Sequence, residues 1–151
     1  MSIRDIRSAH TYRQTILIVD DQPTVLAIHE AVLKSALPGA RIVCMTDAGA
    51  ALKWLRNKHV DLIITDYRMQ QMDGIHFVHA LQGSSSVSVQ PIIVVTALND
   101  EKIHQQLLSA GVAACLKKPV QAAQLSGISR TLLEQGRQNY TGNKDEVNKV
   151  I

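Results

Sequence analysis

Short apolar runs rich in β-branched residues recur along this chain, and they constrain its fold more than any other feature. The clearest are ILIV at 16–19, LII at 62–64 and IIVV at 92–95. Near-continuous runs of this kind belong in strands that are covered on both faces. Segments with helical spacing separate them, so strands and helices alternate along the chain. We therefore predict an α/β fold with a doubly wound, five-stranded parallel sheet.

The helical segments are placed by their apolar spacing and by the residues that start and stop them. After Pro23, apolar residues repeat at helical spacing until Pro38 and Gly39 end the first helix. We predict the other helices after Asp47, around Ile75, from Asn99 or Asp100 and over 121–135, and the other strands at 41–45 and 112–116. From Gly136 onwards the sequence is polar, and we expect weak structure there.

The length of 151 residues supports one well-buried domain. We divide the chain into an N-terminal arm over 1–14, a domain over 15–136, and a polar C-terminal tail or start of a linker over 137–151. No apolar segment approaches the length that crosses a bilayer, and residues 1–14 are polar. We therefore expect a cytoplasmic protein with neither a membrane span nor a secretory signal.

The net charge of +3 raises the question of nucleic-acid binding. The positive residues are scattered, however, and aromatic residues make up only 3% of the chain, so no base-stacking platform is visible. No recognisable DNA-binding module follows Gln135. We expect a solvated surface and no direct nucleic-acid partner.

Polar residues follow four of the apolar runs, at the points where the predicted strands end. They are Asp20 with Asp21, Asp66, Thr96, and Lys118 before Pro119. Singly, each is a common turn residue, and Asp66 alone would be read as the start of a turn. The carboxyl ends of parallel strands meet at one edge, where open α/β sheets bind ligands. Three converging carboxylates repel one another, and a hard cation such as Mg²⁺ with a nearby amine relieves that repulsion.

The order and spacing of these residues resemble the receiver domain of bacterial two-component response regulators. The resemblance runs from about Thr15 to about Gln135 and rests on the pair Asp20 and Asp21, on Asp66 with the following MQQMDG, on Thr96 with Ala97, and on Lys118 with Pro119. It implies a flavodoxin-like receiver fold with strand order 2-1-3-4-5. In that order Cys44 and Cys115 lie on opposite edge strands, too far apart to form a disulfide.

The resemblance also implies the roles of the site residues. Asp66 would be the nucleophile that accepts a phosphoryl group from a sensor histidine kinase or a phosphotransfer protein. Mg²⁺ would be bound directly by Asp21 and Asp66, through water by Asp20, and by the backbone carbonyl of Arg68. Lys118 and Thr96 would bind phosphoryl oxygens, while the small Ala97 leaves room for the group.

Two positions depart from the family pattern. Gln70 stands where the family usually has proline, which affects the stiffness of that loop. Cys115 stands where the family often has an aromatic residue that moves with the hydroxyl residue to remodel the surface of the fourth helix, fifth strand and fifth helix. We expect Thr96 and Ala97 to carry the switch here, with Cys115 nearly passive, because a thiol exchanges little apolar surface.

Other functions remain open from the sequence. A phosphatase with Asp66 as nucleophile would generally need a second acid two residues later, where this chain has Arg68. A degenerate receiver would only bind partners, although every acid, hydroxyl and amine of the site is present. The output is also open: the chain acts alone, as a homodimer, or through an effector domain beyond Ile151. The stretch from VDLII to DYRM is similar to receivers attached to cyclic-dinucleotide phosphodiesterase domains.

Overall fold

The structure is a computed structural model that describes residues 13–83, 90–97 and 99–149. Its strands are β1 (Thr15–Val19), β2 (Arg41–Met45), β3 (Leu62–Asp66), β4 (Ile92–Thr96) and β5 (Ala114–Lys117). Its helices are α2 (Pro23–Ala36), α3 (Ala48–Leu55), α4 (Gly74–Gln82), α5 (Glu101–Ser109) and α6 (Ala122–Lys149). The strands form one parallel sheet in the order β2-β1-β3-β4-β5. The predicted fold and strand order are therefore confirmed.

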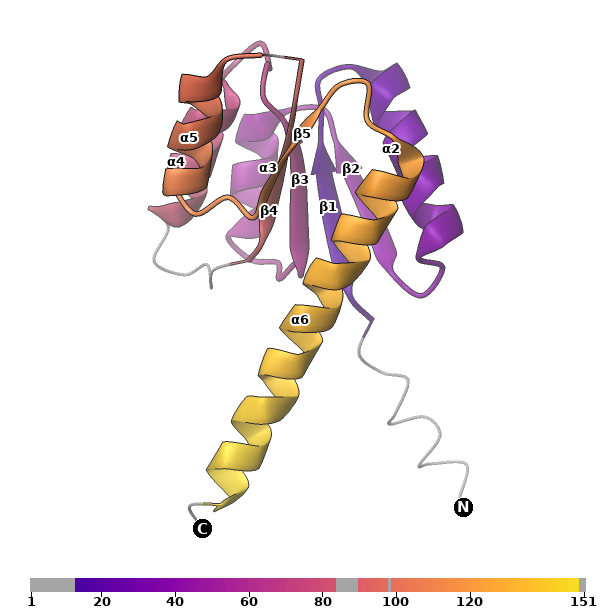
Figure 1. Cartoon of the computed structure of the whole chain (residues 1–151), viewed down its shortest axis with the longest axis vertical. Helices are drawn as coiled ribbons and strands as arrows, with labels where there is room; N and C mark the ends of the chain where they lie inside the picture. Colours follow the sequence, from indigo (N-terminus) through magenta and orange to yellow (C-terminus); the bar gives the residue numbers. More distant parts are fainter. Residues whose placement is uncertain (1–12, 84–89, 98, 150–151) are drawn as a thin grey trace.

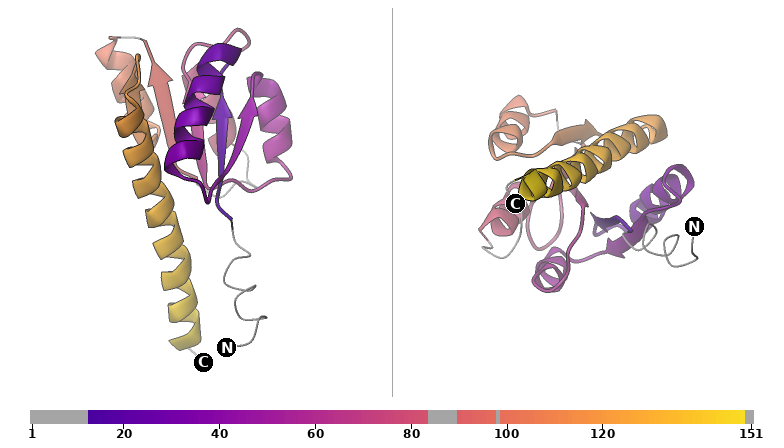
Figure 2. Two further views of the ribbon diagram at one scale, coloured as in Figure 1. Left: turned by 90° about the vertical axis from the view of Figure 1, so that its right-hand side faces the viewer. Right: turned by 90° about the horizontal axis from the view of Figure 1, so that it is seen from below.

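Two separate apolar layers cover the sheet, as the successive side chains of each strand point to opposite faces. Leu17 and Ile63 belong to the layer beneath α3, α4 and α5, whose largest fully buried side chain is Phe77. Their neighbours Ile16 and Ile64 belong to the layer beneath α2 and α6. Figure 2 shows the two groups of helices on either side of the strands. The inner strands are buried on both faces, which explains their unbroken apolar sequences.

Side-chain caps fix the starts of three helices. Asp47 accepts a hydrogen bond from the backbone amide of Ala50 at the start of α3, over 2.8 Å. Asp73 caps α4 and Asp100 caps α5 in the same way, each over 3.0 Å. Asn99 and Asp100 were both predicted as possible caps of α5, and the structure shows that Asp100 is the cap. Each cap satisfies an amide that the first helical turn leaves without a partner.

Two boundaries differ from the sequence prediction by more than one residue. β5 begins at Ala114 rather than at residue 112, and α6 continues to Lys149 instead of ending at Gln135. The expectation of weak structure over residues 136–149 was therefore wrong, because these residues are helical. A glycine inside a helix costs only about 1 kcal/mol relative to alanine, so Gly136 does not end α6. The buried first half of α6 supplies the helical nucleus, and further turns then add at low cost. In Figure 1, α6 runs well past the end of the sheet.

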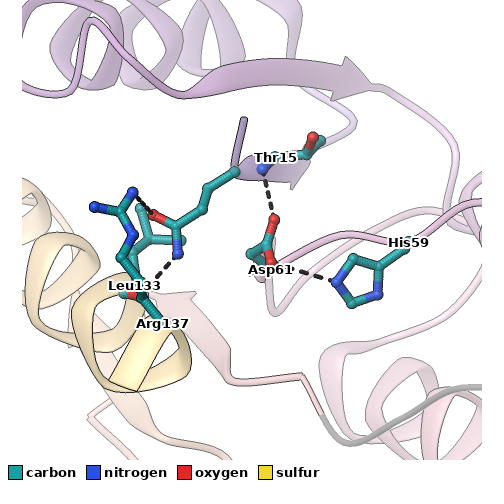
Figure 3. A network of polar contacts seen from close by, with 6 residues as sticks. Thr15, His59, Asp61, Leu133 and Arg137 are labelled. Carbon is teal, nitrogen blue, oxygen red and sulfur yellow. Dashed lines mark hydrogen bonds and ion pairs between the residues drawn. The ribbon is translucent and has the colours of Figure 1, made fainter. Parts of the chain in front are cut away.

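Gln14, the residue before β1, holds α6 at Leu133 and Arg137, two helix residues labelled in Figure 3. Its buried side chain donates from Nε2 to the carbonyl of Leu133 at 2.8 Å and accepts from the Arg137 guanidinium at 3.0 Å. Nearby, the Asp61 carboxylate accepts the backbone amide of Thr15 at 2.8 Å. The start of β1 is therefore fixed to α6 on one side and to the residue before β3 on the other.

In the part of the chain that the structure describes, no helix combines the length and the apolar character needed to cross a bilayer.

The loop between β3 and α4 closes through a tight contact at Gly74. The Gly74 amide donates to the carbonyl of Tyr67 at 2.6 Å. A Cβ at this glycine would lie 2.8 Å from Tyr67 Cδ2 and 3.1 Å from Tyr67 Cα. Any larger residue would have to push the loop that follows Asp66 out of place.

We predict that Gly74→Ala lowers the free energy of unfolding by about 1–3 kcal/mol through this overlap. Denaturant unfolding measures the loss. Gly39→Ala is the matched control, because a Cβ at Gly39 would meet nothing within 4 Å. That control should stay within about 0.5 kcal/mol of the wild type. Equal stability of the two variants would contradict the proposed contact.

Candidate functional site

Three carboxylates meet at one edge of the sheet. Asp20 and Asp21 follow β1, and Asp66 is the last residue of β3. β1 and β3 are parallel neighbours with Val19 opposite Thr65, so the acids that come next lie side by side. One oxygen from each carboxylate can be chosen so that all three lie within 4.8 Å of one another. The structure therefore brings together the three acids that the sequence predicted.

Each acid is contacted by its own hydrogen-bond donor. The Gln22 amide donates to Asp20 Oδ1 at 2.9 Å, and the Gln70 amide donates to Asp21 Oδ2 at 3.0 Å. Lys118 Nζ lies 2.9 Å from Asp66 Oδ1, in an ion pair whose carboxylate side chain is only 5% exposed. The carboxylates are thus oriented by contacts that do not depend on a bound ion. Charge-assisted hydrogen bonds of this kind are stronger than neutral ones.

The electrostatics of the cluster are unfavourable for three ionised acids. Burial raises the pKa of the Asp20 carboxyl, and the charges of Asp66 and Asp21 raise it further. The Gln22 amide and Lys118 act in the opposite direction. Burial also lowers the pKa of His29 on α2, and the positive charge of Lys118 adds to this effect. A neutral His29 therefore contributes no positive charge to offset the acids.

The donor set fits a hard divalent cation. Mg²⁺ prefers oxygen ligands, takes one or two carboxylates and keeps several of its waters. Asp20, Asp21 and Asp66 supply such oxygens close together. The pKa of Asp20 is raised first by burial and then by the charges of Asp66 and Asp21, and a cation would offset those charges. Arg68 lies two residues after Asp66 with an exposed side chain. Its predicted backbone contact with the metal remains a prediction.

Thr96 and Lys118 lie at the same edge as Asp66. Thr96 is the buried last residue of β4, directly after Val95, which pairs with Asp66. The Lys118 amide donates to the Thr96 carbonyl at 2.8 Å, which joins the end of β4 to the end of β5. The peptide bond between Lys118 and Pro119 is cis. The Lys118 amine is thus brought to the acids, and Thr96 lies at the same edge of the sheet, with the exposed Ala97 immediately after it.

Both cysteines are free and lie on opposite edge strands, as predicted. Cys44 on β2 donates to Glu30 Oε2 at 2.8 Å, and burial together with this contact raises the pKa of its thiol to about 12. Cys115 on β5 is half-buried against the layer that contains Ile103, and burial raises its pKa as well. Thiolate chemistry at neutral pH is therefore disfavoured at both positions.

Sequence reasoning missed the Gln22 and Gln70 contacts and the proximity of His29. The first two are made by backbone amides, which every residue except proline carries, so side-chain identity gives no signal. His29 lies on the same face of α2 as Leu26 and Leu33, and all three side chains are buried. Its helical spacing could have identified it as a core position.

The sequence matches a known protein family whose members carry a site of this kind. The family described as the response regulator receiver domain matches residues 16–129. The chain belongs to this family. Receiver domains are modules of phosphorylation-based signalling that interact with histidine kinases or phosphotransfer proteins, and they bind Mg²⁺ at an acidic pocket. The family therefore accounts for an acidic cluster at this edge of the sheet.

Individual relatives agree with the family. The chain is 36% identical over 124 residues to the cyclic di-GMP phosphodiesterase response regulator RpfG of Xanthomonas campestris, an overlap of 82% of this chain but only 33% of RpfG. The signal receiver domain of an HD domain-containing protein from Pseudomonas fluorescens is 29% identical, with a TM-score of 0.73 over 84% of this chain and 99% of that one. Chemotaxis response regulator CheY4 of Vibrio cholerae is 25% identical, with a TM-score of 0.72 over 80% and 99%. This receiver thus spans about a third of RpfG.

We predict that Asp20→Asn stabilises the receiver without metal at neutral pH. The folded state raises the pKa of Asp20 above the unfolded value of 3.8, so ionising this group favours unfolding. The wild type should lose stability as the pH rises from 3.8 through the raised pKa, and the variant should escape that loss.

Thermal unfolding in chelator, measured across this pH range, checks the prediction. The variant should have the higher Tm at pH 7, and the difference should vanish in acid, where Asp20 is protonated. Added Mg²⁺ should reduce the advantage by stabilising the wild type more. A lower Tm for the variant in chelator at pH 7 would show that the charge on Asp20 is not destabilising.

Proposed function

We propose that this receiver is a phosphorylation-controlled switch whose acceptor is Asp66. A sensor histidine kinase or a phosphotransfer protein would supply the phosphoryl group in an Mg²⁺-dependent step. The observation that carries the proposal is the environment of the Asp66 carboxylate. It is nearly buried at the end of β3, lies beside the carboxylates of Asp20 and Asp21, and contacts Lys118 Nζ at 2.9 Å. We place the protein in the cytoplasm.

In the transfer step, a carboxylate oxygen of Asp66 attacks phosphorus as the bond from phosphorus to the donor histidine nitrogen breaks. The product is an acyl phosphate on Asp66. Mg²⁺ held by Asp20, Asp21, Asp66 and the carbonyl of Arg68 would neutralise charge on the transferring oxygens. Lys118 Nζ exchanges part of its contact with Asp66 for a phosphoryl oxygen.

Thr96 and Ala97 complete the acceptor site on the side of β4. The Thr96 hydroxyl donates to another phosphoryl oxygen, and the small side chain of Ala97 leaves space for the group. Because the Thr96 carbonyl accepts the Lys118 amide, a shift of Thr96 also acts on the end of β5. The phosphorylated state is thereby coupled to the surface of α5, β5 and α6, which we propose controls a partner or an effector domain.

A hydrolase of small phosphoesters is the alternative that uses the same nucleophile. Such an enzyme needs an acid near Asp66 to protonate the leaving group. Arg68 occupies the usual position of that acid, and its side chain is exposed. The arrangement favours a protein that catalyses only its own phosphorylation and dephosphorylation. A degenerate receiver is also disfavoured, because all the acidic, hydroxyl and amine groups are present at one edge.

The relatives suggest the kind of output. RpfG is named a cyclic di-GMP phosphodiesterase response regulator, and the Pseudomonas neighbour is the receiver of an HD domain-containing protein. We propose that this receiver likewise controls a cyclic-dinucleotide phosphodiesterase domain. A homodimer is compatible with this output, and α6 continues to Lys149 as a helix on which such a domain could follow.

We expect acetyl phosphate to add a single phosphoryl group to the protein, at Asp66, only when Mg²⁺ is present. The metal must offset repulsion between the carboxylate and the incoming group. Intact-mass measurement detects the product. Asp66→Asn should remain unlabelled, whereas Asp47→Asn, which changes a capping acid outside the cluster, should label like the wild type. Labelling that persists in Asp66→Asn or in chelator would exclude this acceptor.

We expect Cys115→Ala to switch almost like the wild type. A thiol that moves between two rotamers exchanges far less apolar surface than an aromatic ring, a difference of about 1 kcal/mol or more in switching energy. Amide spectra with and without beryllofluoride, followed at α5 and β5, measure the response. Cys115→Tyr should enlarge the response of β5. Loss of the phosphate-dependent shifts in Cys115→Ala would refute the passive role.

A further inference from the structure

We propose that the backbone amide of Gln70 positions Asp21 for divalent-cation binding, and that proline at this position would remove the contact. The inference rests on the proposed metal site of this receiver and adds a residue to it. Gln70 acts through Asp21 and is therefore a positioning residue. The hydrogen bond runs from Gln70 N to Asp21 Oδ2 over 3.0 Å and joins segments 49 residues apart.

The loop that carries Gln70 is fixed at both ends. At its start, the Tyr67 amide donates to the Val95 carbonyl at 2.9 Å and continues the pairing of β3 with β4. At its end, the Gly74 amide returns to the Tyr67 carbonyl, and Asp73 caps α4. Between these anchors, Gln70 is the point at which the loop reaches across to the end of β1. The amide is thus presented to Asp21 by a restrained backbone.

Asp21 is the acid of the cluster that most needs such a contact. Asp20 is buried and already accepts the Gln22 amide, and Asp66 is nearly buried and pairs with Lys118. Asp21 is only half-buried, so the surrounding protein restrains its side chain less. A carboxylate offers about four lone-pair positions. Accepting the amide at Oδ2 therefore orients the group and leaves Oδ1 available to a cation.

The same amide opposes the repulsion between the carboxylates. Its partial positive charge lies against one oxygen of Asp21, close to the two other acids. An oriented and partly compensated carboxylate loses less freedom when it binds a cation, so binding is tighter. Proline has no backbone N–H and cannot provide this donor. The exposed side chain of Gln70 is not required, because the contact is made by the backbone.

The test compares Gln70→Pro with Gln70→Ala, which retains the amide. Mg²⁺ binding is measured by calorimetric titration on the unphosphorylated protein. We expect Gln70→Pro to weaken binding by about three- to tenfold, the range that the loss of one typical intramolecular hydrogen bond produces. Gln70→Ala should bind within about twofold of the wild type, because its donor is intact. Equal affinities for the two variants, or tighter binding by Gln70→Pro, would overturn the proposal.

A second measurement separates the lost donor from any effect of the proline ring on folding. In the wild type without metal, the amide proton of Gln70 should resonate downfield in ¹H–¹⁵N spectra, and Asp21→Ala should move it upfield. Replacing the amide of residue 70 by an ester removes the N–H without adding a ring, and it should reproduce the weaker binding. An unmoved Gln70 resonance in Asp21→Ala, or wild-type affinity of the ester, would refute the contact. A wild type that binds no Mg²⁺ would instead refute the metal site itself.

Discussion

Repulsion among three carboxylates at one edge of the sheet governs the rest of the site. The parallel arrangement of β1 and β3 places Asp20, Asp21 and Asp66 together, whether or not a cation is bound. Each acid is held by a separate donor, two of them backbone amides and one the ammonium of Lys118. The fold thus holds three carboxylates that repel one another in fixed positions. A cation or the proposed phosphoryl group would therefore meet a site whose geometry already exists.

Rigid elements carry the residue that we propose as acceptor. Asp66 and Thr96 are the last residues of strands buried on both faces, so their backbones have little freedom. Ala97 follows β4 with an exposed side chain. A fixed acceptor beside an exposed loop would suit the proposed switch, because the chemistry would stay in place while the surface around α5 changes.

The sequence allowed the sheet to be predicted almost residue by residue, because the runs at 16–19, 41–45 and 92–95 are bounded by polar or turn residues. The acids, Thr96 and Lys118 could be found for the same reason, since each lies at the end of a strand or just after it. The extent of α6 could not, because it depends on tertiary anchoring that local composition does not reveal. The hydrogen bonds from the Gln22 and Gln70 amides could not be predicted either, since any residue but proline supplies a backbone donor.

The hydrogen bonds from Gln14 to Leu133 and from Arg137 back to Gln14 fix α6 near its middle, and this contact is the point about which the helix would tilt. Beyond Arg137 the helix continues for a dozen residues, a length of roughly 18 Å at 1.5 Å per residue. A tilt of about 10° at this contact would displace the far end by roughly 3 Å over that length. A small tilt of α6 within the domain would therefore become a displacement of several ångström at its C-terminal end.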